Sequence, residues 1–178
     1  EMCIRDSEQV TPKVGLQYLK NMNFSSIVKD DYTLATSLGG FTKGVSPLEM
    51  ASAYAALEND GMFRQPNCIK SIVDADENVV YSSQMAEVSI YEKDATRTMT
   101  DVLTTVMDSG TGAALKLSNM PCAGKTGTTN DHKDGWFVGY TRYYTTSVWV
   151  GCDYPKSISN LSGSTYPGQI WNCLLYTS

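Results

Sequence analysis

The segment Ala123-Gly124-Lys125-Thr126-Gly127-Thr128-Thr129 combines one lysine with small residues and with threonines at alternate positions. Side chains alternate between the two faces of a β-strand, so the pattern predicts that Lys125 shares one face with Gly127. Thr126 and Thr128 then share the opposite face. Glycine inside a strand weakens it and often marks the close approach of a ligand or of another backbone. The segment predicts a strand with one open face, and its surroundings decide between a functional site and an ordinary small-residue edge.

Two segments that follow keep the same period of two. Residues 135–141 and 145–151 alternate in the way of half-buried strands, and short polar connections separate them from each other and from residues 122–129. Consecutive strands with short connections are typical of an antiparallel meander, in which the lysine segment is the first strand. In the second strand, one predicted face carries Trp136, Val138 and Tyr140, and the other carries Phe137 and Gly139.

Capping signals and helical periodicity predict helices that flank this sheet. Ser46-Pro47-Leu48-Glu49 is a capping box with proline at the first helical position, and the helix that it begins ends before Gly61. Residues 94–108 have apolar side chains at helical spacing. The predicted buried faces are Met50, Tyr54 and Leu57 in the first helix, and Ala95, Met99, Val102, Leu103 and Val106 in the second.

The N-terminal part of the chain has one further helix signal. Thr11-Pro12 begins a helix that fades near Asn21, with the threonine as its cap. Residues 24–43 are polar and irregular, which indicates a loop with short turns. The apolar face expected for this helix is formed by Val14, Tyr18 and Leu19.

The remaining segments complete the expected domain. Residues 68–73 and 79–82 indicate a peripheral hairpin, and residues 167–171 begin a last helix. Residues 1–7 and 173–178 show no helix or strand pattern and are interpreted as non-native tails. We therefore expect one α+β domain over residues 8–172, in which an antiparallel sheet is flanked by helices.

Composition excludes several classes of function. The formal net charge of −5, without a basic cluster, argues against a nucleic-acid partner. The longest apolar runs are too short for a transmembrane segment. Five cysteines without a C-x-x-C spacing, together with a single histidine, do not suggest a metal site, and we expect no cofactor. His132, Asp131 and Asp134 lie in a predicted strand connection and are interpreted as solvated turn residues.

The lysine segment and the strand after it together resemble a known family. Lys125-Thr126-Gly127-Thr128, followed by Asp134-Gly135-Trp136-Phe137-Val138-Gly139-Tyr140, resembles the third motif of the penicillin-binding protein transpeptidases. Residues 44–51 and 148–151 are similar to the class A, bifunctional members. The resemblance runs from about Val10 to Asn172 and implies an incomplete β-lactamase-like transpeptidase domain.

The resemblance also implies a role for each residue of the motif. Lys125 would place positive charge beside the serine of the second family motif and attract a substrate carboxylate. Thr126 and Thr128 would hydrogen-bond that carboxylate, and the backbone N–H of Thr128 would form half of an oxyanion hole. Gly127 would keep the strand face open for a peptide. Lys125 and Thr128 are thus the candidate catalytic residues, and Thr126, Gly127 and Thr128 the candidate substrate-binding residues.

The chain departs from the family pattern at the other two motifs. The family carries Ser-x-x-Lys, Ser-x-Asn and Lys-Thr-Gly in that order, and no Ser-x-Asn occurs here. Ser26-Ile27-Val28-Lys29 fits the first motif in letters only, because residues 24–31 lack the helical periodicity that would place serine and lysine on one face. We therefore expect the C-terminal part of a transpeptidase domain, inactive alone, with one sheet face left exposed.

The resemblance implies a reaction, partners and a location. The parent protein would be a D,D-transpeptidase that cross-links peptidoglycan stem peptides through a serine acyl-enzyme and is trapped by β-lactams. It would lie on the extracytoplasmic face of the bacterial membrane and be anchored there. The alternatives are a serine β-lactamase, a non-catalytic β-lactam sensor or binding module of the same fold, and a purely structural domain.

Overall fold

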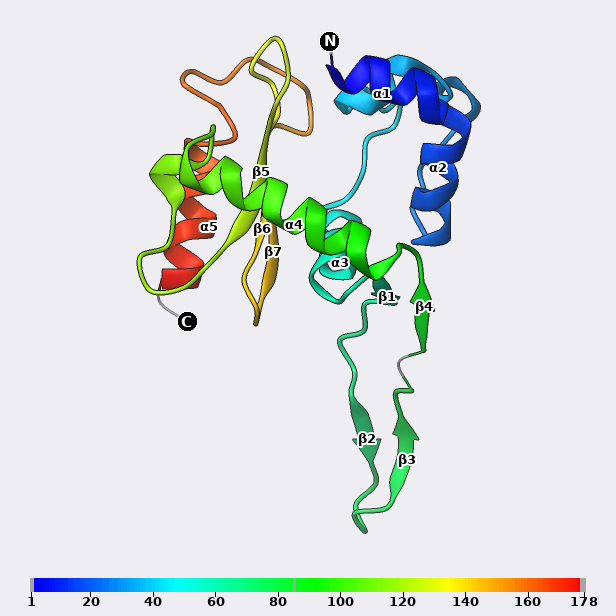
Figure 1. The fold of residues 1–178 in the computed structure, drawn as a ribbon. Coiled ribbons are helices and arrows are strands. Elements are labelled where there is room, and N and C mark those ends of the chain that lie inside the picture. The colour runs from blue at the N-terminus through cyan, green and yellow to red at the C-terminus, as the bar shows by residue number, and fades with distance from the viewer. Residues whose placement is uncertain (1, 85, 177–178) are drawn as a thin grey trace.

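The sheet at the centre of the molecule consists of β5 (Ala123–Thr128), β6 (Gly135–Tyr140) and β7 (Thr145–Val150). It is seen in a computed structural model that describes residues 2–84 and 86–176 (Figure 1). The strands are antiparallel in the order β5-β6-β7, with Lys125 opposite Val138. The predicted meander is confirmed. Within the described residues β5 is paired on one side only, so it forms an edge of the sheet.

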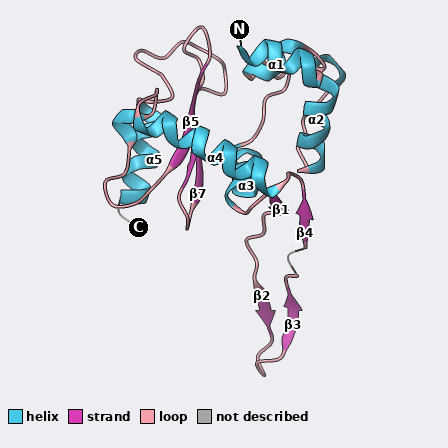
Figure 2. Cartoon of the chain, in the orientation of Figure 1, coloured by secondary structure: helices cyan, strands magenta, loops and turns pink. Residues whose placement is uncertain are grey.

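Helices cover both faces of this sheet (Figure 2). On one face Phe137 packs against Trp171 of α5 (Tyr166–Tyr176), with ring centroids 4.9 Å apart. On the other face Tyr140 meets Tyr54 of α3 (Pro47–Glu58) edge to face, at 6.4 Å. The predicted division of β6 into two faces is confirmed, and so is the α+β fold class. The expectation of an exposed sheet face is wrong, because α3 and α5 supply the two covering layers.

The helix α4 (Lys93–Asp108) lies against β5, and its predicted position in the sequence is confirmed. Its buried face differs from the prediction, however. Met99 is 45% exposed and Val102 is 55% exposed, whereas Thr96, Leu103 and Met107 are buried. At 100° per residue, the observed stripe is turned about a quarter of a turn from the predicted one. Leu103 is common to both because it packs on Ala123 and Tyr140 at the edge of the sheet.

Two helices form the N-terminal part of the described chain, α1 (Met2–Val10) and α2 (Pro12–Asn21). Residues 2–7, which show no helix or strand pattern in the sequence, are therefore helical. Tertiary packing explains α1, since it lies against the 3₁₀ helix η2 (Leu34–Leu38). Thr11 has φ 72° and makes no side-chain cap, so α2 begins without the predicted threonine cap. The helix buries Leu16 rather than Val14 or Tyr18.

Residues 24–43 are irregular apart from η2 and the short 3₁₀ helix η1 (Lys29–Asp31), as the sequence predicts. Ser26, Ile27 and Val28 have no helical assignment. The serine and lysine of Ser26-Ile27-Val28-Lys29 therefore do not stand one turn apart on a helix. The prediction that this segment is not helical, and so cannot present a first motif, is confirmed.

A narrow hairpin projects from the body of the molecule (Figure 1). Its strands β2 (Ser71–Val73) and β3 (Val79–Ser82) are the predicted peripheral hairpin, and we call residues 68–83 the arm. At its base, β1 (Met62–Arg64) pairs with β4 (Glu87–Ser89) in a second two-stranded sheet. The sequence did not indicate β1 and β4, because each has only three residues.

The last helix is longer than predicted. The α5 helix continues to Tyr176, so residues 173–176 are helical although the sequence shows no helix pattern there. Trp171 and Leu175 are four residues apart and both are buried, which extends one apolar stripe along the helix. The short 3₁₀ helix η3 (Ala113–Leu115) packs beside α5. None of the helices in the described part of the chain combines the length and apolar character needed to cross a membrane.

Candidate active site

Lys125 lies on the edge strand β5 and is exposed to solvent. Its Nζ donates a hydrogen bond to the backbone oxygen of Thr126, at 2.9 Å. The ammonium group therefore lies along the edge of the sheet. Among the described residues, Lys125 Nζ makes its hydrogen bond to this backbone oxygen and none to a serine hydroxyl.

The register of β5 and β6 decides which backbone groups reach the open edge. Thr129 N–H donates to the carbonyl of Asp134 at 3.1 Å, one pair beyond Thr128 and Gly135. In an antiparallel pair, residues bonded to the partner strand alternate with residues whose N–H and C=O point away from it. Because Thr129 is bonded to the partner strand, the backbone N–H and C=O groups of Thr126 and Thr128 point away from that strand. Their N–H groups face the edge that is unpaired within the described residues, and the bond from Lys125 Nζ to Thr126 O agrees with this.

The hydroxyl groups of Thr126 and Thr128 are both held by other segments. Thr126 Oγ1 lies 2.7 Å from Thr111 Oγ1, and either hydroxyl can be the donor. Thr128 Oγ1 accepts a hydrogen bond from Gly163 N–H at 3.0 Å. The two threonines thus share one side of the strand, as the alternation of side chains predicts. Sequence reasoning missed Thr111 and Gly163 as neighbours of the motif.

Gly163 lies where the loop between β7 and α5 crosses the motif. A Cβ at this position would lie 2.5 Å from the carbonyl oxygen of Trp136 and 2.7 Å from the backbone nitrogen of Gly127. Only glycine permits so close an approach of two backbones. The loop is anchored nearby, because Leu161 is fully buried and its carbonyl lies 2.7 Å from Nδ1 of His132. His132 is exposed, as predicted, and its ring also ties the β5–β6 turn to this loop.

The glycines inside β5 have different neighbours. A Cβ on Gly124 would lie 2.9 Å from the ring of Phe137, so this glycine is required by core packing. A Cβ on Gly127 would lie 3.2 Å from Cβ of Trp136. A side chain at 127 would therefore press on the second strand. At both glycines, the atoms that come close to the strand belong to the protein itself.

The carboxylates of the β5–β6 turn are already engaged. Asp134 accepts a hydrogen bond from Nε1 of Trp149 at 3.0 Å, which fixes the start of β6 against β7. Asp131 pairs with Lys133 at 2.8 Å, and this lysine lowers the pKa of Asp131. Their positions agree with structural roles in the turn. No group of three or more potential metal ligands occurs in the part of the chain that the structure describes.

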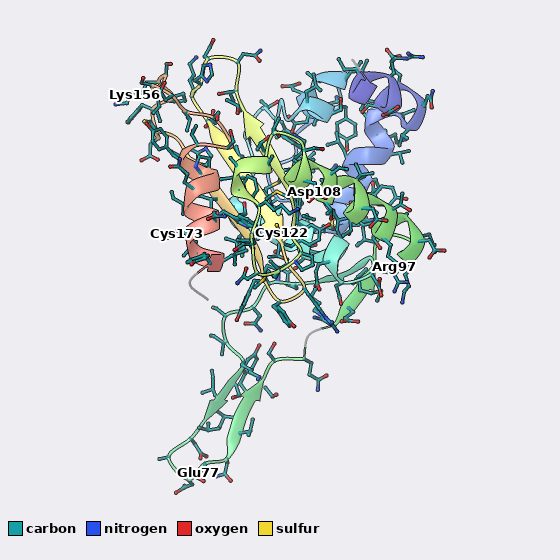
Figure 3. All side chains as sticks on the ribbon, turned by 60° about the vertical axis from the view of Figure 1, so that its left-hand side comes forward. Glu77, Arg97, Asp108, Cys122, Lys156 and Cys173 are labelled. Atoms are coloured by element: carbon teal, nitrogen blue, oxygen red, sulfur yellow. The ribbon has the colours of Figure 1, made fainter. Side chains whose placement is uncertain are left out.

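A cavity of about 680 Å³ lies at the opposite end of β5 from the motif. Its lining comes from the end of α3, from α4, and from the turn after β6, and includes Cys122, just before β5, and Ala123, the first residue of β5. Figure 3 shows Cys122 near the middle of the molecule, with Arg97 towards one end of α4 and Asp108 at the other. Lys125, Thr126 and Thr128 do not line this cavity, so it is separate from the motif.

Comparison with known proteins shows one family whose domain includes both the fold and the motif. Residues 12–170 match the penicillin binding protein transpeptidase domain. The chain belongs to this transpeptidase family. The match covers the motif, all of α3, the first five residues of α5, and the loop that carries Gly163.

Relatives within the family include penicillin-binding protein 4 of Bacillus subtilis, which is 34% identical over 95% of this chain and 27% of its own length. Penicillin-binding protein 1A of Aquifex aeolicus is 38% identical over 92% of this chain and 21% of its own length. Both are class A penicillin-binding proteins. The chain thus spans about a quarter of the length of these transpeptidase relatives.

Solved structures of penicillin-binding proteins share the fold. Penicillin-binding protein 1A from Haemophilus influenzae superimposes with a TM-score of 0.82 at 20% identity, over 99% of this chain and 32% of that one. The protein PonA1 from Mycobacterium tuberculosis gives 0.75 at 26% identity, over 89% of this chain and 47% of that one. A second structure of PonA1 is a complex with penicillin V, with a TM-score of 0.73 at 25% identity.

Proposed function

We propose that this chain supplies one wall of a penicillin-sensitive D,D-transpeptidase site. The observation that carries the proposal is the Lys-Thr-Gly-Thr segment on the edge strand of a transpeptidase-family domain, with the N–H groups of Thr126 and Thr128 directed to the edge. The proposal assigns the site to residues 8–172, as the C-terminal part of the transpeptidase domain. Residues 1–7 and 173–178 are proposed to have no part in it.

The proposed reaction is acyl transfer through a serine. The serine oxygen attacks the carbonyl carbon between the last two D-alanines of a stem peptide, and its proton passes to a base and then to the departing amine of D-alanine. The amine of a neighbouring stem peptide then attacks the ester carbonyl carbon and forms the cross-linking amide, while the C–O bond to the serine breaks and a proton from the amine passes through the base to the serine oxygen. The serine belongs to a first motif, and within the described residues Ser26 and Lys29, which fit its letters, do not stand one turn apart on a helix.

Each residue of the motif has a proposed task. The ammonium group of Lys125 places positive charge beside the serine of the second family motif, which supports proton transfer, and it attracts the terminal carboxylate of the substrate. Negative charge develops on the carbonyl oxygen during attack, and the edge-facing N–H of Thr128 can stabilise it. One such fixed donor contributes roughly 10²–10³ to the rate. The hydroxyls of Thr126 and Thr128 hydrogen-bond the carboxylate, and Gly127 keeps side-chain bulk away from the peptide.

The proposed partners and location follow from this reaction. Stem peptides of peptidoglycan and β-lactams are the ligands, and penicillin V bound to PonA1 supports the latter by similarity. Peptidoglycan is cross-linked outside the cytoplasm, so the whole protein is proposed to act at the extracytoplasmic face of the membrane and to be anchored there.

Labelling with a fluorescent penicillin tests the proposal in two samples. The longest natural gene product that contains these residues is expected to label with one penicillin per molecule, whereas the 178-residue chain alone is expected not to label. In the long protein, Lys125→Ala should lower the second-order labelling rate about 100-fold or more. Lys133→Ala is the matched control, since Lys133 pairs with Asp131 in the neighbouring turn, and it should label normally.

Other results would contradict particular parts of the proposal. Unchanged labelling of Lys125→Ala would show that this strand is not the site. Stoichiometric labelling of the 178-residue chain would show that it contains the nucleophile after all. Rapid hydrolysis of a chromogenic β-lactam by the long protein would indicate a β-lactamase, and labelling without transpeptidation would indicate a β-lactam sensor.

A further inference from the structure

Two segments outside the motif contact the hydroxyl groups that are proposed to bind the substrate carboxylate. One is the turn after α4, which places Thr111 beside Thr126. The other is the loop between β7 and α5, which places Gly163 N–H against Thr128. These contacts decide which way each hydroxyl proton can point, and the inference below rests on the proposed function.

A threonine hydroxyl has one proton to donate and two lone pairs that accept. Gly163 N–H can only donate, so its bond to Thr128 occupies a lone pair of that oxygen. The hydroxyl proton of Thr128 has no partner among the described residues. It is therefore left to donate to a group outside the strand.

The hydroxyl of Thr126 likewise has only one proton to donate. A carboxylate accepts hydrogen bonds and cannot donate one. If Thr126 donates its only proton to a carboxylate, then Thr111 must donate to Thr126, because the two oxygens are 2.7 Å apart. A hydroxyl that accepts one bond while donating another is polarised and becomes a better donor.

We propose that Thr111 and Gly163 are positioning residues that turn the hydroxyl protons of Thr126 and Thr128 towards the carboxylate of the substrate. Two donors in a row match the two acceptor oxygens of a carboxylate. A carboxamide or an ester at the same place is matched less well, because an amide NH₂ or an ester alkoxy group would face one of the donors. Thr111 and Gly163 thus help the site to select ligands with a free carboxylate.

Both positioning groups are held firmly by their own surroundings. Gly112, next to Thr111, donates its N–H to the carbonyl of Val106 at 3.1 Å, and a Cβ there would lie 2.8 Å from the sulfur of Met107. Beside Gly163, the hydroxyl of Thr165 accepts from Ser162 N–H at 2.8 Å. The turn after α4 is thus bonded to that helix beside its contact with β5, whereas the loop is bonded internally beside its contact and anchored two residues away by the buried Leu161.

Thr111→Val in the longest natural gene product is the main test, because Thr111 is exposed and valine keeps its shape. We expect about a 3- to 10-fold lower second-order rate of acylation by benzylpenicillin, the size expected for one hydrogen bond. The loss should lie in the binding constant and not in the rate of the bound complex. Thr111→Ser should restore the rate, and Thr98→Val, on the exposed surface of α4, should leave it unchanged.

Two further measurements show whether Thr111 acts through Thr126. In a Thr126→Val background, adding Thr111→Val should have no further effect. With the methyl ester of benzylpenicillin, which lacks the carboxylate, the wild-type protein and Thr111→Val should react equally. Gly163 is not substituted, because any side chain there would collide with Trp136 O and Gly127 N.

The outcomes separate this inference from the proposed function. If Lys125→Ala abolishes acylation but Thr111→Val is as fast as wild type or faster, the site is correct and the positioning role is wrong. Additive effects of Thr111→Val and Thr126→Val, or equal losses with acid and ester, would also overturn it. If the wild-type protein is not acylated at all, the proposed function fails first.

Discussion

Asp31 shows how much one residue can organise in a segment without regular structure. It is fully buried, and its carboxylate accepts from the backbone N–H groups of Val28 and Thr42, each at 2.7 Å. The hydrogen bond from Thr42, followed by that from Val28, lowers the pKa of Asp31. A buried carboxylate is costly unless it is paired or bonded in this way. Asp31 therefore closes residues 28–42 into a loop.

Asp31→Asn is expected to destabilise the protein at neutral pH, because an amide can accept through only one oxygen and its NH₂ would face a donor. The carboxylate has a lowered pKa in the folded state, so its stabilising effect is present above the ordinary aspartate pKa and is lost as the pH falls through the lowered value. The difference in urea midpoint between wild type and variant should thus shrink below about pH 4. Asp30→Asn, at the exposed neighbouring position, should change the midpoint little; equal shifts in both variants would contradict the role of Asp31.

The residues of the candidate site divide into those that the sequence could predict and those that it could not. Lys125, Thr126 and Thr128 lie where the period of two places them, because a six-residue strand has few ways to arrange its side chains. Thr111 and Gly163 reach the same threonines from 15 and 35 residues away. Contacts of that kind depend on how loops are packed in three dimensions, and no local pattern encodes them.

At the scale of elements, the sequence predicted the start of α3 better than the buried face of α4. The capping box at the start of α3 is present, with Ser46 accepting from Glu49 N–H and Glu49 accepting from Ser46 N–H. Burial alone would raise the pKa of Glu49, but bonds from Ser25 and Ser46 outweigh it and lower the pKa. Such ends depend on neighbouring residues in sequence. The face that a helix buries depends on the layer beside it, as the turned stripe of α4 shows.

Two methionines on α4 test which face of this helix is buried. Met107 has no exposed surface and belongs to the cluster around Phe137 and Trp171, whereas Met99 is 45% exposed. Met107→Ala is expected to lower the free energy of unfolding by about 2–5 kcal/mol, because it leaves a cavity in the core. Met99→Ala should cost less than about 0.5 kcal/mol. Chemical denaturation of both variants measures this, and a larger loss at Met99 would favour the face predicted from the sequence.

At the scale of the whole molecule, the structure divides into a layered body and the arm. The body holds the sheet between α3 and α5, and its core includes Phe137, Trp171 and Met107. The arm has no such layer on either side. Its apolar side chains are exposed by between 44% and 63%: Ile69, Ile72, Val73, Val79, Val80 and Tyr81.

The shape of the arm has a consequence for how the molecule opens. A two-stranded hairpin without a covering layer is marginally stable in water, so β2 and β3 should separate often while the body stays folded. Amide hydrogens of Ile72 and Tyr81 are therefore expected to exchange with deuterium by local opening, much faster than those of Phe137 and Val138 in β6. Hydrogen exchange followed by NMR measures this; uniform protection across arm and body would show one cooperative unit. Local opening of the arm would also allow a protease to cut the chain near Glu77 and leave the motif on β5 intact.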